Sequence, residues 1–164
     1  MVESATLSLP DPAATERLGA SLSDAIRTVA PPSLVLYLEG ELGAGKTALT
    51  RALLAALGHA GRVPSPTYTL VEPYRLANYR VLHVDLYRLR DPAELDDLGL
   101  VDELGAGSLL IAEWPSRGAG RLPAPDLECE MVIVGTGREA RFAGRSDAGL
   151  KVLRELRQVL PAGF

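Results

Sequence analysis

The sequence predicts a single α/β domain whose sheet mixes parallel and antiparallel strands and is flanked by helices. The chain has 164 residues, which is the length of one ordinary domain. Residues 40–47 read Gly-Glu-Leu-Gly-Ala-Gly-Lys-Thr and match the phosphate-binding loop pattern G-x-x-x-x-G-K-[ST]. An apolar run at 33–38 precedes this loop like a buried strand, and 47–57 follow it like a helix that Gly58 closes. Because strand, glycine-rich loop and helix are the context that the motif requires, we predict one P-loop NTPase domain over residues 1–164.

Capping residues and periodicity predict the remaining elements. Asp11-Pro12 is typical of a helix start, and the apolar stripe that follows continues up to Pro31. Asp91-Pro92 predicts a second helix start of the same kind. Residues 67–72 and 80–87 are rich in β-branched and aromatic side chains, and 73–79 connect them. This pattern predicts an antiparallel hairpin. After the loop helix, the predicted strands are 67–72, 80–87, 108–113, 127–134 and 139–142, and a last helix begins near Ser146.

The chemistry of the loop predicts a nucleoside triphosphate site. Glycines allow successive backbone N–H groups to converge on anionic oxygens, and the following helix adds the positive end of its dipole. Lys46 is one of only two lysines among seventeen basic residues, so an ammonium at this position looks selected rather than inherited from composition. Its compact charge can reach between β- and γ-phosphates, and the Thr47 hydroxyl can bind Mg²⁺. The alternative is a glycine-rich turn that only caps a helix.

Two acidic residues end apolar runs, Asp85 after 81–84 and Glu113 after 109–112. In a P-loop sheet the carboxyl ends of the strands face the same edge as the loop, so an acid there can reach the shell of the metal. Periodicity alone leaves open which carboxylate holds Mg²⁺ and which orients water. The alternative for either one is a surface acid that leaves a strand.

Four other residues have structural and functional interpretations. Trp114, the only tryptophan, could stack on an adenine ring, although composition alone favours a core or lid residue. Thr67 lies in a Ser/Thr/Pro loop where related enzymes place a γ-phosphate-sensing switch, a weak signal on spacing alone. His83 lies inside an apolar strand, where a core histidine is the favoured interpretation. Cys129, the only cysteine, is predicted to be a small core residue.

Composition excludes several classes of protein. The formal net charge of −4 argues against bulk electrostatic attraction to nucleic acid. No segment has the apolar length that spans a bilayer, and 1–11 lack the basic start of a signal peptide. A single cysteine allows no internal disulfide, which suits a reducing compartment. We therefore expect a cytoplasmic protein.

Four strings occur in fixed order: Leu-Gly-Ala-Gly-Lys-Thr at 42–47, Ser-Pro-Thr-Tyr-Thr-Leu-Val-Glu-Pro-Tyr at 65–74, His-Val-Asp-Leu-Tyr-Arg at 83–88 and Glu-Trp-Pro at 113–115. Together they resemble the TsaE (YjeE) family, the small bacterial ATPase of tRNA threonylcarbamoyladenosine biosynthesis. The resemblance covers about residues 9–141. It implies a cytoplasmic protein that works with TsaB and TsaD, and TsaD places threonylcarbamoyl on adenosine 37 of certain tRNAs. It also implies that ATP hydrolysis by this subunit drives turnover of the complex, which links the subunit to tRNA indirectly.

The resemblance also assigns roles to matching residues. Lys46 and the loop amides would hold the phosphates of ATP or ADP, and Thr47 would bind Mg²⁺. Glu113 matches a metal-site acid, and Asp85 an acid in the metal shell or one that orients water. Thr67 takes the switch position. The nucleotide-binding residues implied are Asp11, Thr15, Gly40, Glu41, Leu42, Gly43, Ala44, Gly45, Lys46, Thr47, Ala48 and Trp114, with Thr15 and Trp114 near the base and Pro12 standing where the family more often has an acid.

Other functions compatible with the loop are a small-molecule or protein kinase and a nucleotide-dependent switch with negligible turnover. A metabolite kinase usually adds a lid and an acceptor pocket with several arginines, and no separate lid insertion is visible. The sequence does not separate a slow ATPase from a switch, since both use the same residues. A direct RNA binder is disfavoured by the acidic charge and by the lack of an aromatic and basic RNA-binding motif.

Overall fold

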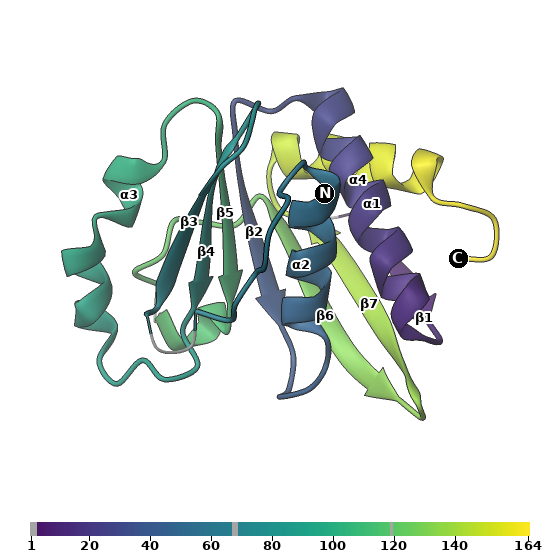
Figure 1. The fold of residues 1–164 in the computed structure, drawn as a ribbon, viewed down its shortest axis with the longest axis horizontal. Coiled ribbons are helices and arrows are strands. Elements are labelled where there is room, and N and C mark those ends of the chain that lie inside the picture. The colour runs from purple at the N-terminus through teal and green to yellow at the C-terminus, as the bar shows by residue number, and fades with distance from the viewer. Residues whose placement is uncertain (1–2, 67–68, 119) are drawn as a thin grey trace.

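A sheet of seven strands forms the centre of the computed structural model, which describes residues 3–66, 69–118 and 120–164 (Figure 1). The strands lie in the order β1-β7-β6-β2-β5-β4-β3. They are β1 (Ser4–Leu9), β2 (Ser33–Glu39), β3 (Val71–Arg75), β4 (Arg80–Asp85), β5 (Ser108–Glu113), β6 (Leu127–Val134) and β7 (Gly137–Gly144). The helices are α1 (Pro12–Val29), α2 (Lys46–Ala56), α3 (Leu100–Glu103) and α4 (Asp147–Val159), with 3₁₀-helices η1 (Pro92–Leu98) and η2 (Pro115–Gly118).

The sheet mixes strand directions, which confirms the predicted fold class. β2 pairs in parallel with both β5 and β6, and β5 pairs in parallel with β4. The antiparallel pairs lie toward the two ends of the sheet, where β3 pairs with β4, and β7 pairs with β6 and β1. Because β2, β4 and β5 are parallel neighbours, their carboxyl ends meet at one edge. The register places Glu113 beside both Leu38 and Asp85 at that edge.

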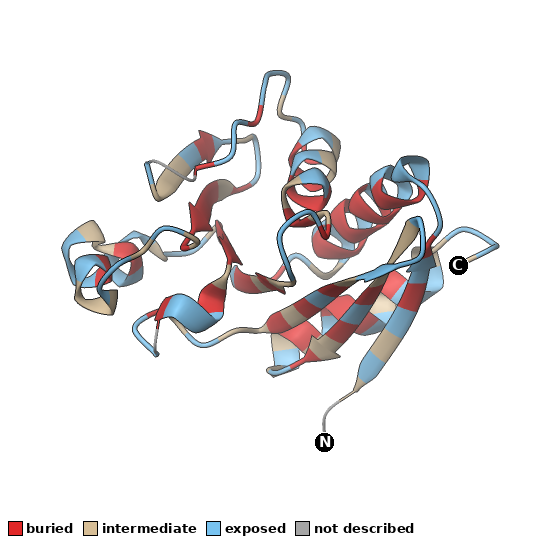
Figure 2. Cartoon of the chain, turned by 90° about the horizontal axis from the view of Figure 1, so that it is seen from below, coloured by how far each residue is buried: buried red, intermediate tan, exposed pale blue. Residues whose placement is uncertain are grey.

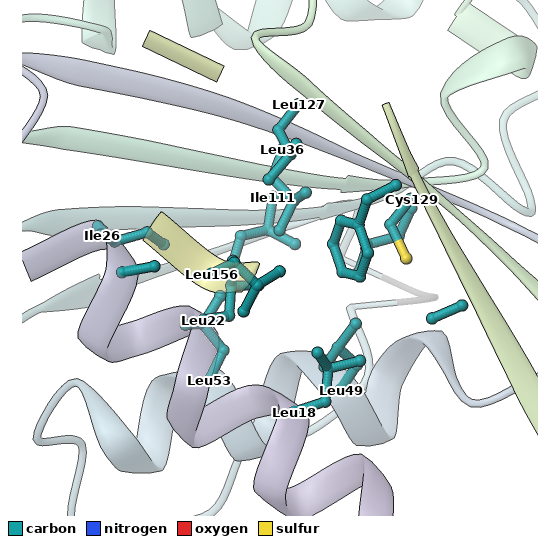
Figure 3. Packing of buried hydrophobic residues seen from close by; sticks show 14 of the residues in the cluster. Leu18, Leu22, Ile26, Leu36, Leu49, Leu53, Ile111, Leu127, Cys129 and Leu156 are labelled. Atoms are coloured by element: carbon teal, nitrogen blue, oxygen red, sulfur yellow. The ribbon is translucent and has the colours of Figure 1, made fainter. Parts of the chain in front are cut away.

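One face of the sheet is covered by α1, α2 and α4, which lie beside one another in Figure 1. Figure 3 shows the core between these helices and the sheet, where leucines of all three helices and Ile26 of α1 meet the strands. Leu22, Leu53 and Leu156 are fully buried there against Ile111. Cys129 lies in the same core, which confirms the prediction that it is a small core residue.

The opposite face is covered only in part. A smaller apolar cluster joins Leu82 and Leu110 of the sheet to Leu95 and Leu100, in the η1–α3 region at the β3–β4 end (Figure 1). On β6 and β7, buried residues alternate with more exposed ones, as the coloured bands in Figure 2 show. Period-two alternation of this kind is typical of strands with one face in the core and one toward water.

The helix starts predicted at Asp11 and near Ser146 are both present. Asp11 accepts a hydrogen bond from the Ala14 amide at the start of α1, and Ser146 accepts one from the Gly149 amide at the start of α4. These bonds satisfy backbone donors that the first helical turn leaves without partners. Within the described residues, no helix combines the length and the apolar composition needed to cross a bilayer.

The largest differences from the sequence prediction are in three places, whereas β4 and β7 differ from it by two residues at one or both ends. β1 was not predicted, although its alternating pattern carried the signal of a strand. β3 begins at Val71 rather than at 67, because Leu70 has a left-handed backbone (φ 66°) that extended strands exclude. The segment after Asp91 forms a 3₁₀-helix, and Gly99, with φ 62°, separates it from the four-residue α3.

Candidate functional site

The phosphate loop connects β2 to α2 through a backbone that only glycine fits. Gly40 has φ 151°, and a Cβ atom there would lie 2.4 Å from the Met131 carbonyl oxygen. Gly45 has φ 104° and caps the N-terminus of α2, whose first residue is Lys46. The loop therefore brings the N-terminal amides of a helix to the carboxyl end of a central strand, an arrangement that favours anions.

Lys46 is almost buried, with 5% of its surface exposed. Its Nζ donates to the carbonyl oxygens of Gly40 (2.5 Å) and Glu41 (3.0 Å), and it lies 4.3 Å from the centre of the Trp114 ring. Burial lowers the pKa of the Lys46 ammonium, and the nearby carboxylates of Glu113 and Asp85 act in the opposite direction. The ammonium is thus held at the base of the loop, with carbonyl oxygens and a π face as its partners.

Glu113 joins the loop to the sheet. Thr47 Oγ1 donates to Glu113 Oε1 over 2.9 Å, and His83 Nε2 lies 2.5 Å from Glu113 Oε2. Because an ionised carboxylate only accepts, His83 is the donor in that bond. Glu113 is 2% exposed and His83 is fully buried. His83 is buried, as the prediction of a core histidine requires. It also contacts Glu113, a predicted site residue.

Asp85 lies at the same edge, beside Glu113 in the pairing of β4 with β5. Its carboxylate accepts from Ser65 Oγ (3.2 Å) and from the Tyr87 amide (2.9 Å). Ser65 belongs to the segment that was predicted to carry the switch. Thr67, the switch residue itself, lies outside the described residues.

A cavity of about 480 Å³ brings together three of the four predicted catalytic residues, and the fourth, Thr67, lies outside the described residues. It contains the lysine and threonine of the loop, both strand-end acids and the tryptophan. The lining residues are Leu42, Gly43, Gly45, Lys46, Thr47, Ala48, Ser65, Asp85, Tyr87, Arg88, Glu113 and Trp114. The Trp114 indole contacts both the Lys46 ammonium and the Tyr87 ring, and the centres of the two rings lie 5.1 Å apart.

A second cavity, of about 740 Å³, lies on the other side of the loop. Asp11 and Thr15 line it together with Gly43, Gly45 and Ala48, which also line the first cavity. The two residues predicted to lie near the base therefore line different cavities. Thr15 faces the larger cavity, whereas Trp114 lines the smaller one with the acids.

Comparison with known proteins decides the family. The model of the family described as "Threonylcarbamoyl adenosine biosynthesis protein TsaE" matches residues 9–141. The chain belongs to the TsaE family. This finding confirms the resemblance that the four sequence strings indicated.

Relatives from two bacteria and a solved structure agree with this assignment. The tRNA threonylcarbamoyladenosine biosynthesis protein TsaE of Haemophilus influenzae is 37% identical over 153 residues, which cover 93% of this chain and 97% of that protein. The protein of the same description from Bacillus subtilis is 37% identical over 112 residues, covering 68% of each. The crystal structure of Bacillus subtilis YdiB matches the fold with a TM-score of 0.77 and 28% identity, covering 96% of this chain and 97% of that one.

The TsaE-family site contains residues that the sequence did not reveal. Thr136, in the turn after β6, and Gly137 and Arg138, at the start of β7, line the larger cavity together with Thr15. Arg138 also donates to the Gly43 carbonyl oxygen, over 3.1 Å from Nη2. The Gly-Thr-Gly-Arg string at 135–138 lies between the predicted strands 127–134 and 139–142, and nothing in it indicates a contact with the phosphate loop.

The donor set of this TsaE-family site fits Mg²⁺. The Thr47 hydroxyl and the carboxylates of Glu113 and Asp85 are hard oxygen donors that line one cavity. No cluster of three His, Cys, Asp or Glu side chains placed to hold a metal occurs in the described part of the chain. Mg²⁺ does not require one, because it usually binds through one or two carboxylates, substrate phosphates and water.

Proposed function

We propose that this TsaE-family protein binds and hydrolyses ATP with Mg²⁺, and that it thereby supports TsaB and TsaD in the threonylcarbamoylation of adenosine 37 of tRNA. The observation that carries the proposal is the convergence of Lys46, Thr47, Asp85 and Glu113 on one cavity. Family membership supports the role in threonylcarbamoyladenosine biosynthesis.

Lys46, Thr47, Glu113 and Asp85 have distinct parts in this proposal. Lys46 exchanges its carbonyl partners for β- and γ-phosphate oxygens, and the α2 N-terminus adds amide donors. Thr47 and Glu113, already joined by a hydrogen bond, would hold Mg²⁺, and the ion would supply positive charge to the phosphates. Asp85, held by Ser65 and the Tyr87 amide, orients the water that attacks the γ-phosphorus, giving ADP and phosphate.

The residues that line both cavities support one orientation of the bound nucleotide. Gly43, Gly45 and Ala48 lie between them, so a ligand with its phosphates beside Lys46 can extend its base toward Thr15 and Arg138. In this arrangement Trp114 covers the phosphate side through its contact with Lys46 rather than stacking on the base.

The direct test is ATP hydrolysis by the purified protein with Mg²⁺ and with EDTA. We expect the Lys46→Ala and Glu113→Ala variants to lose turnover by on the order of a hundredfold, the typical effect of removing an electrostatic donor or metal acid. Lys151→Ala is the matched control, because this other lysine is exposed on α4 and pairs with Asp147. Unchanged turnover in both site variants would refute the site.

The same assay separates hydrolysis from a kinase reaction. A hydrolase releases inorganic phosphate in proportion to the ATP consumed. Transfer of the phosphoryl group to a small metabolite or protein, without release of inorganic phosphate, would favour the kinase alternative.

A further inference from the structure

His83 has a role that its burial alone does not explain. It lies two residues before Asp85 on β4, so both side chains project from the same face of the sheet. That face carries the core beneath α2, where Val81 and Ile111 are fully buried. His83 therefore reaches the site from the core side, beneath the carboxylate of Glu113.

The two oxygens of Glu113 have different partners. His83 Nε2 lies 2.5 Å from Oε2, whereas Thr47 Oγ1 is closer to Oε1 (2.9 Å) than to Oε2 (3.2 Å). The Glu113 carboxylate cannot rotate without breaking the hydrogen bond between its Oε2 and His83 Nε2. The other oxygen is thereby kept toward the loop hydroxyl.

We propose that His83 is a positioning residue that fixes the Glu113 carboxylate so that Oε1 and Thr47 Oγ1 face the Mg²⁺ of a bound nucleotide together. The inference rests on the proposed function. In other proteins, side chains that hydrogen-bond to a metal ligand and so orient it contribute about tenfold to a hundredfold to metal affinity. Removing His83 should therefore weaken Mg²⁺ binding more than it weakens nucleotide binding.

The test measures how Mg²⁺ strengthens the binding of a fluorescent ADP analogue, in a titration from EDTA to saturating Mg²⁺ at constant pH. We expect His83→Leu to raise the Mg²⁺ concentration at half-effect by about tenfold or more. Affinity for the analogue in EDTA should stay near that of the wild type. His83→Gln, whose amide can reach the position of Nε2, should recover much of the loss.

A matched control separates positioning from general loosening of the core. Val81→Ala removes buried side-chain volume on the same face of β4 without touching Glu113, and it should leave the Mg²⁺ half-effect unchanged. If His83→Leu does not fold, the comparison of His83→Gln with His83→Asn replaces it, since the shorter amide does not reach Oε2. A weaker Mg²⁺ effect in the Asn variant than in the Gln variant supports the proposal.

Two results overturn the proposal. One is an unchanged Mg²⁺ half-effect in a folded His83→Leu variant, or equal effects in the Gln and Asn variants. The other is an equal loss in Val81→Ala, which would make His83 a packing residue only. Failure of the proposed function looks different, because then the wild type itself shows no Mg²⁺ effect and Glu113→Gln changes nothing.

Discussion

Lys46 has partners that a phosphate can replace. Its Nζ donates to two carbonyl oxygens of its own loop and lies over the Trp114 ring. Phosphate oxygens carry full charge and attract an ammonium more strongly than carbonyl oxygens do. Binding of ATP should therefore change the surroundings of the indole.

Trp114 fluorescence should report this exchange. We expect its emission to change when ADP or ATP is added, and the chain's single tryptophan makes the signal unambiguous. In Lys46→Ala the change should be much smaller, because the ammonium that moves from the ring to the phosphates is gone, while Arg117 stays over the ring. A flat titration, under conditions where an independent assay detects bound nucleotide, would contradict the placement of Trp114.

At the residue scale, the sequence predicted groups whose position follows from one element. Lys46 and Thr47 follow from a motif, and Asp85 and Glu113 from the ends of strands. The contact of His83 with Glu113 could not be predicted, because it depends on a diagonal between neighbouring strands. The approach of Arg138 to Gly43 depends on where a distant hairpin turn lies.

At the element scale, the packing of α1 against α2 depends on Gly19. A Cβ atom at Gly19 would lie 2.4 Å from Ala52 Cβ and 2.8 Å from the Ala52 backbone carbon. In an open helical position, replacing glycine by alanine stabilises a protein by roughly 0.5–1 kcal/mol. The close contact reverses this expectation.

We expect Gly19→Ala to lower the free energy of unfolding by about 1–3 kcal/mol, because the helices must move apart or strain. Urea denaturation followed by circular dichroism measures the change. Ala20→Gly on the exposed side of α1 provides the comparison for helix propensity alone. Equal or greater stability of Gly19→Ala would contradict the close contact.

Most elements could be predicted because their signals are local. Capping by Asp11 and Ser146 and the apolar strands 33–38 and 108–113 are examples. The start of β3 could not be predicted, because it is set by the left-handed backbone of Leu70. β1 had a local signal, and its pairing with β7 depends on a contact more than a hundred residues away.

At the scale of the whole molecule, Cys129 is a probe of global unfolding. Burial raises the pKa of its thiol far above the ordinary value, so little reactive thiolate forms at neutral pH. We expect a thiol reagent to label the native protein very slowly and the urea-unfolded protein completely, and absorbance of the released chromophore measures this. Rapid labelling of the native protein would show that the core around β6 opens locally.

The fold class could be predicted from the phosphate loop and its flanking elements, whereas the strand order could not. β2 pairs with β5 and β6 because of contacts between distant segments, whereas the antiparallel pairing of β3 with β4 follows from the predicted hairpin. That order places β2, β4 and β5 side by side and so brings both acids to the loop. The proposed activity therefore depends on the order of the strands in the sheet.

The most direct test of the central claim is the rate of ATP hydrolysis by this protein, alone and with purified TsaB–TsaD. We expect slow, Mg²⁺-dependent turnover alone and a clear increase with the partners, both lost in Lys46→Ala and retained in Lys151→Ala. The same rate in wild type and Lys46→Ala, or a rate that TsaB–TsaD leaves unchanged, would contradict it.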